Sequence, residues 1–138
     1  MSPCGDILSG SLGGTCMRQS VVVVDHDRET LSAIAQILEP HYDVQLFRDG
    51  QKALAHLRSS EPPSLLMSDL RLPGLNGFMV LNEARRICPE LKTMLLSEYL
   101  TGSCESELGI VSKFAQAMIC KPFCHHELIG KIKKLLGC

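Results

Sequence analysis

Residues 65–77 read LLMSDLRLPGLNG, and this stretch combines a short apolar run, an aspartate and two turn signals. The run Leu65–Ser68 predicts a buried strand. Asp69 follows the run directly, and the Pro73-Gly74 and Asn76-Gly77 pairs predict turns before the next helix. The stretch therefore predicts a strand, a loop and a helix, with Asp69 at the carboxyl end of the strand.

Three other strand-like runs carry a polar side chain at the corresponding place. Val21–Val24 is followed by Asp25, Met94–Leu96 by Ser97 and Met118–Cys120 by Lys121. Parallel strands that are flanked by helices open their carboxyl ends into one crevice. We therefore expect two carboxylates, a hydroxyl and an ammonium group to lie together, a set that suits a divalent cation and a phosphoryl group.

Helix-like segments alternate with the strands along the chain. The expected strands are Val21–Val24, Val44–Phe47, Leu65–Ser68, Thr93–Leu96 and Ala117–Cys120. The expected helices follow the Asp27 cap, Asp49-Gly50 and Gly77, and then cover residues 101–114, where Gly102 and Gly109 weaken the pattern, and Glu127–Leu136. This alternation predicts an α/β fold with a single doubly wound, five-stranded parallel sheet, right-handed crossovers and five helices.

Length and charge narrow the class of protein. The chain has 138 residues, enough for one domain with a sizeable core, and we expect a flexible Gly- and Ser-rich leader over 1–19 and a domain over 20–138. Lys and Arg total 14 against 15 Asp and Glu, so no basic excess favours nucleic-acid binding. No apolar run approaches the roughly 20 residues that cross a bilayer. We expect a soluble, cytoplasmic protein.

The seven cysteines show no paired CxxC spacing, and their number is odd. We interpret them as reduced thiols that serve as small apolar side chains. Cys120, Cys124, His125 and His126 form the one dense cluster, and a shared zinc ion is the alternative interpretation there.

Four segments together resemble the receiver domain of two-component response regulators, in the CheY-like, flavodoxin-like superfamily. They are VVVDHD at 22–27, SDLRLPGLNG at 68–77, LLS at 95–97 and KPF at 121–123. The resemblance covers about residues 20–136, almost everything after the expected leader. It implies a flavodoxin-like fold with strand order 2-1-3-4-5 and the site at the carboxyl ends of the strands.

The resemblance also implies roles for single residues. Asp69 matches the phosphoacceptor, which takes a phosphoryl group from a kinase phosphohistidine with Mg²⁺ as cofactor. Asp25, Asp69 and the backbone carbonyl of Arg71 match the metal ligands. Lys121 matches the ammonium group that pairs with the phosphate, and Ser97 the hydroxyl that binds it and moves on activation. The bond from Lys121 to Pro122 matches a cis peptide.

Three positions depart from the family pattern. His26 stands where the second acidic metal ligand is usual, and an imidazole is poorly matched to Mg²⁺, so we expect weak binding or a water in that place. His26 pointing to solvent, with Asp27 supplying charge, is the alternative. Glu98 and Tyr99 are larger than the usual residues there, which predicts slower phosphoryl exchange. Met118 stands at the aromatic switch position, and filling a core gap is its alternative role.

The leading interpretation is a phosphorylation switch that assists its own phosphorylation and dephosphorylation and is otherwise no enzyme. Its expected partners are a histidine kinase or phosphotransfer protein, and an output domain or protein at the face made by 101–114, Ala117–Cys120 and Glu127–Leu136. We expect no direct nucleic-acid or membrane contact, and a homodimer on phosphorylation. The alternative function is a pseudo-receiver that signals through protein contacts without phosphorylation because His26 weakens the metal site. An aspartyl phosphatase is disfavoured, because Arg71 cannot replace the second aspartate of such enzymes.

Overall fold

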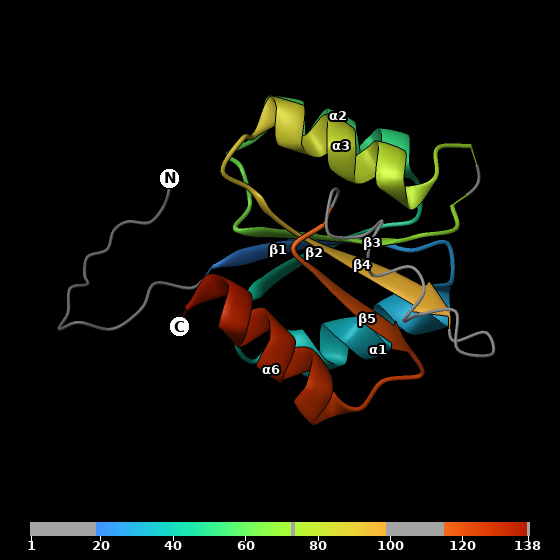
Figure 1. Ribbon diagram of the computed structural model, residues 1–138, viewed down its shortest axis with the longest axis vertical. Helices are drawn as coiled ribbons and strands as arrows, with labels where there is room; N and C mark the ends of the chain where they lie inside the picture. Colours follow the sequence, from blue (N-terminus) through green and yellow to red (C-terminus); the bar gives the residue numbers. More distant parts are fainter. Residues whose placement is uncertain (1–18, 73, 99–114, 138) are drawn as a thin grey trace, which may run out of the picture.

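Five parallel strands form a sheet between two pairs of helices in the computed structural model, which describes residues 19–72, 74–98 and 115–137 (Figure 1). The strands are β1 (Ser20–Val24), β2 (Asp43–Phe47), β3 (Leu65–Asp69), β4 (Lys92–Glu98) and β5 (Ala117–Lys121). The helices are α1 (Arg28–Leu38), α2 (Gly50–Ser59), α3 (Gly77–Ile87) and α6 (His125–Leu136). The expected leader lies outside the described residues except for Gln19.

The strand order in the sheet is β2-β1-β3-β4-β5, and all four neighbouring pairs are parallel. This confirms the expected fold class and strand order. The register brings the strand ends together, because Val24 pairs with both Phe47 and Ser68, and Asp69 pairs with Leu96. The residues that follow these strands therefore emerge along one edge of the sheet.

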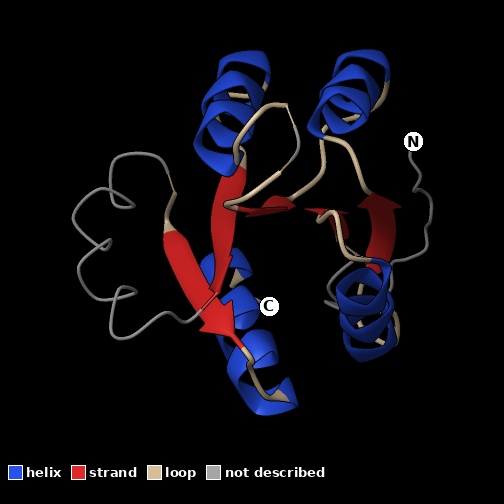
Figure 2. Ribbon diagram, turned by 90° about the vertical axis from the view of Figure 1, so that its right-hand side faces the viewer, coloured by secondary structure: helices blue, strands red, loops and turns tan. Residues whose placement is uncertain are grey.

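The helices cover both faces of the sheet. Helices α2 and α3 lie on one face and α1 and α6 on the other, which Figure 1 shows in one view and Figure 2 from the side. Alternate residues of β1 point to opposite faces, so that Val22 and Val24 pack with the α2 and α3 cluster and Val21 and Val23 with the α1 and α6 cluster. Because β1 and β3 are covered on both faces, their apolar runs are continuous rather than alternating.

Polar caps define where the helices start. Asp27 accepts a hydrogen bond from the Glu29 backbone N–H at 3.1 Å, as expected for the N-cap of α1. Helix α6 starts at His125, two residues before the expected Glu127, because Cys124 Sγ accepts from the Glu127 backbone N–H and so caps the helix. The expected helix over 101–114 lies outside the described residues. The part of the chain that the structure describes contains four of the five expected helices.

The cysteines differ in part from the expectation of reduced thiols. Cys88 and Cys124 are free, and Cys120 is disulfide-bonded. A disulfide removes the thiolate that would bind zinc, which rules out Cys120 as a zinc ligand in this oxidation state. No spacing pattern in the sequence indicated the bond, because disulfide pairing depends on distances set by the fold.

Within the described ranges, none of the helices has the length and the apolar character that a membrane crossing requires.

Candidate functional site

Three charged side chains meet at the carboxyl edge of the sheet. Asp25 follows β1, Asp69 ends β3 and Lys121 ends β5. The ammonium nitrogen Nζ of Lys121 lies 2.8 Å from Asp25 Oδ2 and 3.5 Å from Asp69 Oδ2. Both aspartates are buried, and the lysine side chain is only 14% exposed. The expected convergence of these side chains is therefore observed, with one ammonium group between two carboxylates.

The turn between β1 and α1 holds His26 beside the two carboxylates. Asp25 Oδ1 accepts a hydrogen bond from the Asp27 backbone N–H at 2.9 Å, and the Arg48 guanidinium donates to the backbone carbonyl of His26 at 3.3 Å. The Nδ1 atom of His26 then lies 3.1 Å from Asp69 Oδ2 and 3.7 Å from Asp25 Oδ1. The imidazole is half exposed, but its Nδ1 atom faces the site rather than the solvent, so the alternative orientation is not the one observed.

The loop after β3 fixes the carboxylate of Asp69. The backbone N–H of Arg71 donates to Asp69 Oδ1 at 3.3 Å, and the N–H of Leu70 donates to the carbonyl of Leu96 at 2.8 Å. Gly77, at the start of α3, approaches the loop so closely that an added Cβ would lie 2.4 Å from the backbone oxygen of Asp69. The close approach explains why a glycine ends the segment 65–77.

Burial and charge shift the pKa of two of these groups. Burial raises the pKa of Asp69, and the neighbouring Asp25 charge raises it further, while Lys121, the Arg71 N–H and His26 partly oppose the rise. Burial lowers the pKa of Lys121, but the hydrogen bond and charge of Asp25 and the charge of Asp69 outweigh it, so the pKa lies above its usual value. The site therefore holds Lys121 as a cation beside an Asp69 carboxylate whose pKa lies above its ordinary value.

Ser97 and Met118 occupy two different settings. Ser97 is buried in β4 directly after Leu96, the register partner of Asp69, and therefore stands near the same edge of the sheet. Met118 is buried in the α2 and α3 cluster, paired in register with Leu95. Its side chain fills core space, which is the alternative role that the sequence left open. The Lys121–Pro122 peptide bond is cis.

A hollow of about 480 Å³ adjoins the site. It is lined by His26, Asp27, Arg28, Glu29, Thr30, Arg48 and Lys121. Sequence reasoning missed Arg48, which directly follows β2 and stands at the same sheet edge as the predicted residues. The sequence does contain a signal for it, because Arg48 follows the strand-like run Val44–Phe47 as Asp25 follows Val21–Val24. The charged lining is mixed, with Arg28, Arg48 and Lys121 beside Asp27 and Glu29.

The residues of the site fit a divalent cation. Ligand atoms of Asp25, His26 and Asp69 all lie within 4.8 Å of one another, a grouping that stands alone in the described part of the chain. Two of the three donors are carboxylate oxygens, which Mg²⁺ prefers, and the third is an imidazole nitrogen, which it does not. The donor set therefore fits a dication in general and Mg²⁺ only in part.

A comparison with models of known protein families gave a match that includes the residues of the site. The family model for the response regulator receiver domain matches residues 21–133, which include Asp25, Asp69, Ser97 and Lys121. The chain belongs to the response regulator receiver domain family. The resemblance that rested on four short segments is thereby confirmed over most of the chain.

Two longer regulators are similar to this chain over part of their own length. The receiver is 32% identical over 121 residues to the DNA-binding response regulator MtrA of Mycolicibacterium paratuberculosis, covering 87% of this chain and 52% of MtrA. It is 28% identical to the C4-dicarboxylate transport transcriptional regulatory protein DctD of Rhizobium meliloti, covering 83% of this chain and 25% of DctD. The receiver thus spans about half the length of MtrA, and a quarter of DctD.

A solved receiver supports the fold independently. The crystal structure of a CheY-like response regulator receiver domain protein from Methanospirillum hungatei superposes with a TM-score of 0.77 and 27% identity, covering 88% of this chain and 95% of that one. The receiver is a signalling domain of flavodoxin-like fold. The side chain of Glu98 and the whole of Tyr99, which bear on the expected slow phosphoryl exchange, lie outside what the structure describes.

Proposed function

We propose that this receiver accepts a phosphoryl group on Asp69 and thereby switches a protein-interaction surface. The observation that carries the proposal is the buried arrangement of Asp25, Asp69 and Lys121, in which one ammonium group lies within 3.5 Å of both carboxylates. A carboxylate that attacks an anionic phosphoryl group needs positive charge beside it. Lys121 supplies that charge from the protein itself.

The proposed transfer forms one bond to phosphorus and breaks another. A carboxylate oxygen of Asp69 forms a bond to phosphorus while the bond from phosphorus to the imidazole nitrogen of the donor breaks. The imidazole leaves with the bonding electron pair and takes up a proton from water, and Asp69 becomes an acyl phosphate. Lys121 pairs with a phosphoryl oxygen of the product, and the Ser97 hydroxyl donates to another.

We propose that Mg²⁺ can serve as the cofactor of this step, with weak binding at this site. Asp25, Asp69 and the backbone carbonyl of Arg71 would hold it, and His26 weakens its binding because imidazole nitrogen is a poor ligand for Mg²⁺. When bound, the cation neutralises charge that develops on the phosphoryl oxygens. The residues of this chain position Asp69 for the reaction, since the Arg71 N–H and the His26 ring both contact its carboxylate.

We infer a histidine kinase or phosphotransfer protein as the phosphodonor. The output surface that we propose includes β5 and α6, and it acts on a linked output domain or a separate protein, or forms a homodimer after phosphorylation. MtrA is named as a DNA-binding regulator and extends beyond the matched region. With a net charge of −1, the 138 residues here are better suited to protein contacts than to direct nucleic-acid binding, so we assign DNA contact, if the whole protein makes it, to another domain.

The test is chemical modification with a small phosphodonor. The protein is incubated with phosphoramidate and Mg²⁺, and intact-mass spectrometry should show one added phosphoryl group. Borohydride reduction followed by peptide mapping should place it on Asp69. Asp69→Asn should abolish the added mass, whereas Glu90→Gln, which alters an exposed acid outside the site, should leave it unchanged.

Two results would contradict the proposal. A phosphoryl group that persists in Asp69→Asn would move the acceptor elsewhere. A wild-type protein that gains no mass with saturating Mg²⁺, and shows no change in amide exchange with beryllofluoride, would favour the pseudo-receiver.

A further inference from the structure

We propose that the cation site of this receiver selects an imidazole-binding first-row metal, of the class of Co²⁺, Ni²⁺ or Zn²⁺, over Mg²⁺, and that His26 is the residue that sets this preference. The inference deepens the proposed function, because it names the metal class at the site around Asp69. It concerns metal binding alone, and it can be measured without any phosphoryl transfer.

The distances at His26 suit one shared cation. Its Nδ1 atom is 3.1 Å from Asp69 Oδ2 and 3.7 Å from Asp25 Oδ1. Ligand atoms bound at about 2.1 Å to one metal ion lie about 3.0 Å apart in octahedral and about 3.4 Å apart in tetrahedral geometry. The two separations from His26 Nδ1 lie close to these values, and all three ligand atoms lie within 4.8 Å of one another.

The position of His26 is set by the backbone around it. The Arg48 guanidinium holds the His26 carbonyl through Nε at 3.4 Å and Nη2 at 3.3 Å, and the Asp27 N–H holds Asp25 Oδ1. These contacts fix the turn from both sides. A donor that is held in place before the metal arrives loses less conformational entropy on binding.

The net charge of the site also lowers its affinity for Mg²⁺. Asp25 and Asp69 bring two negative charges, and Lys121 offsets one of them while holding both Oδ2 atoms. Binding of Mg²⁺ depends on anionic oxygen ligands, so a site with one uncompensated charge binds it weakly. Co²⁺, Ni²⁺ and Zn²⁺ also bind the imidazole nitrogen. The low net charge of the site therefore weakens their binding less than it weakens the binding of Mg²⁺.

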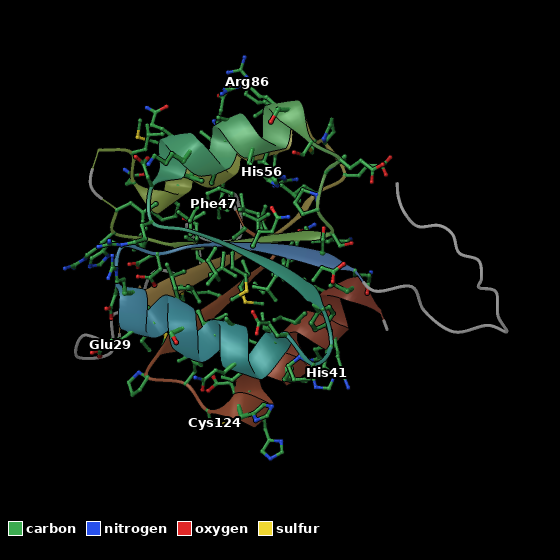
Figure 3. All side chains as sticks on the ribbon, turned by 180° about the vertical axis from the view of Figure 1, so that it is seen from behind. Glu29, His41, Phe47, His56, Arg86 and Cys124 are labelled. Carbon is green, nitrogen blue, oxygen red and sulfur yellow. The ribbon has the colours of Figure 1, made fainter. Side chains whose placement is uncertain are left out.

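A second group of possible metal donors requires a control. His125 and His126 are exposed at the start of α6, with ring centroids 5.8 Å apart, and Cys124 precedes them with a free thiol, at the place labelled in Figure 3. These side chains lie outside the Asp25, His26 and Asp69 grouping. The double variant His125→Ala/His126→Ala removes this surface pair and leaves the proposed site intact.

The experiment compares Co²⁺ with Mg²⁺ by calorimetric titration of wild type, His26→Asp and the double variant, in the absence of phosphodonor. We expect the ratio of the Mg²⁺ to the Co²⁺ dissociation constant to fall by about tenfold or more in His26→Asp, which presents only oxygen donors. The double variant should keep the wild-type ratio. Proton NMR of the Co²⁺-loaded wild type should show one strongly shifted, exchangeable imidazole N–H that His26→Asp lacks and the double variant retains.

Each outcome decides between the two proposals. An unchanged ratio in His26→Asp, or a shifted N–H signal that survives in it, overturns the metal preference and leaves phosphorylation of Asp69 standing. A confirmed preference in a protein whose Asp69 takes no phosphoryl group with either metal refutes the phosphoacceptor function and leaves the metal site standing. A signal lost in the double variant would assign the bound metal to His125 and His126 and overturn the inference.

Discussion

At the scale of single residues, the electrostatics of the site rest on two buried aspartates that share one lysine. Lys121 satisfies Asp25 at 2.8 Å more closely than Asp69 at 3.5 Å. Burial and the charge of Asp25 raise the pKa of Asp69, and Lys121 at this longer distance opposes the rise only in part. A buried carboxylate with a raised pKa costs the folded state stability at neutral pH.

Asp69→Asn should stabilise the protein at neutral pH. Burial and the Asp25 charge raise the pKa of Asp69 in the folded state above its ordinary value of 3.8, so the folded state binds more protons there and stability falls as pH rises through this range. We expect the variant to gain about 1 kcal/mol in free energy of unfolding at pH 7. The gain should vanish below the ordinary pKa, where the wild-type carboxyl is neutral in both states.

Urea unfolding at a series of pH values measures this difference. Glu90→Gln is the control, because Glu90 is exposed and should show no such pH-dependent gain. A variant that is less stable than wild type at pH 7 would mean that the contacts of the Asp69 carboxylate with Lys121, His26 and the Arg71 N–H outweigh its burial and repulsion.

At the scale of elements, the start of α3 is packed directly against the end of β3. A Cβ at Gly77 would meet the Asp69 backbone oxygen at 2.4 Å and the Leu70 Cα at 2.8 Å, and backbone atoms cannot move aside as a flexible side chain can. Gly77→Ala should therefore destabilise the fold by about 2 kcal/mol and slow the modification of Asp69. Thermal unfolding and the rate of phosphoramidate modification measure the two effects.

Gly130→Ala is the matched control for Gly77→Ala. Gly130 lies inside α6 with no atom within 4 Å of an added Cβ. Alanine there should stabilise by about 0.5–1 kcal/mol, because it lowers the backbone entropy of the unfolded chain and favours the helix. Equal effects of the two substitutions would show that the contact at Gly77 does not constrain the loop.

The cap of α6 offers a second prediction for an element. Cys124 Sγ accepts from the Glu127 N–H at 3.4 Å, and sulfur is a weak acceptor. Cys124→Ser should stabilise by about 0.5 kcal/mol, since serine is a preferred N-cap. Cys88→Ser, at a buried thiol in the α2 and α3 cluster, should instead destabilise, because it places a hydroxyl in an apolar cluster. Thermal unfolding under reducing conditions, which keep disulfide exchange out of the comparison, distinguishes the two.

At the scale of the whole molecule, one sheet joins two apolar clusters. Figure 3 shows Phe47 and His56 on the α2 side of the sheet, with ring centroids 5.3 Å apart, and Glu29 and His41 at the two ends of α1 on the other side. Because β1 and β3 contribute side chains to both clusters, neither cluster can be lost without exposing the strands of the other. We therefore expect the described domain to unfold as one unit.

Truncation in either cluster tests this coupling. Ile34→Ala, in α1, and Leu81→Ala, in α3, each remove a fully buried side chain and should destabilise by about 2–5 kcal/mol. Far-UV circular dichroism and methyl NMR signals from the two faces should lose structure at the same urea concentration in each variant. Separate transitions for the two faces would contradict a single cooperative unit.

The sequence alone determined the alternation of strands and helices, and it placed Asp25, Asp69, Ser97 and Lys121 at or next to strand ends. These are local features, since apolar runs, caps and turn pairs act over a few neighbouring residues. The family resemblance added the strand order 2-1-3-4-5, which local pattern does not contain.

Only the tertiary structure decided which atoms meet at the site. His26 Nδ1 contacts Asp69 across 43 residues and Lys121 contacts Asp25 across 96, and Arg48 enters from the end of a different strand. The disulfide bonding of Cys120 also appeared only with the fold. Such distances depend on strand order, register and rotamers together. The sequence left two orientations open for His26, and only the fold shows its Nδ1 atom facing the carboxylates.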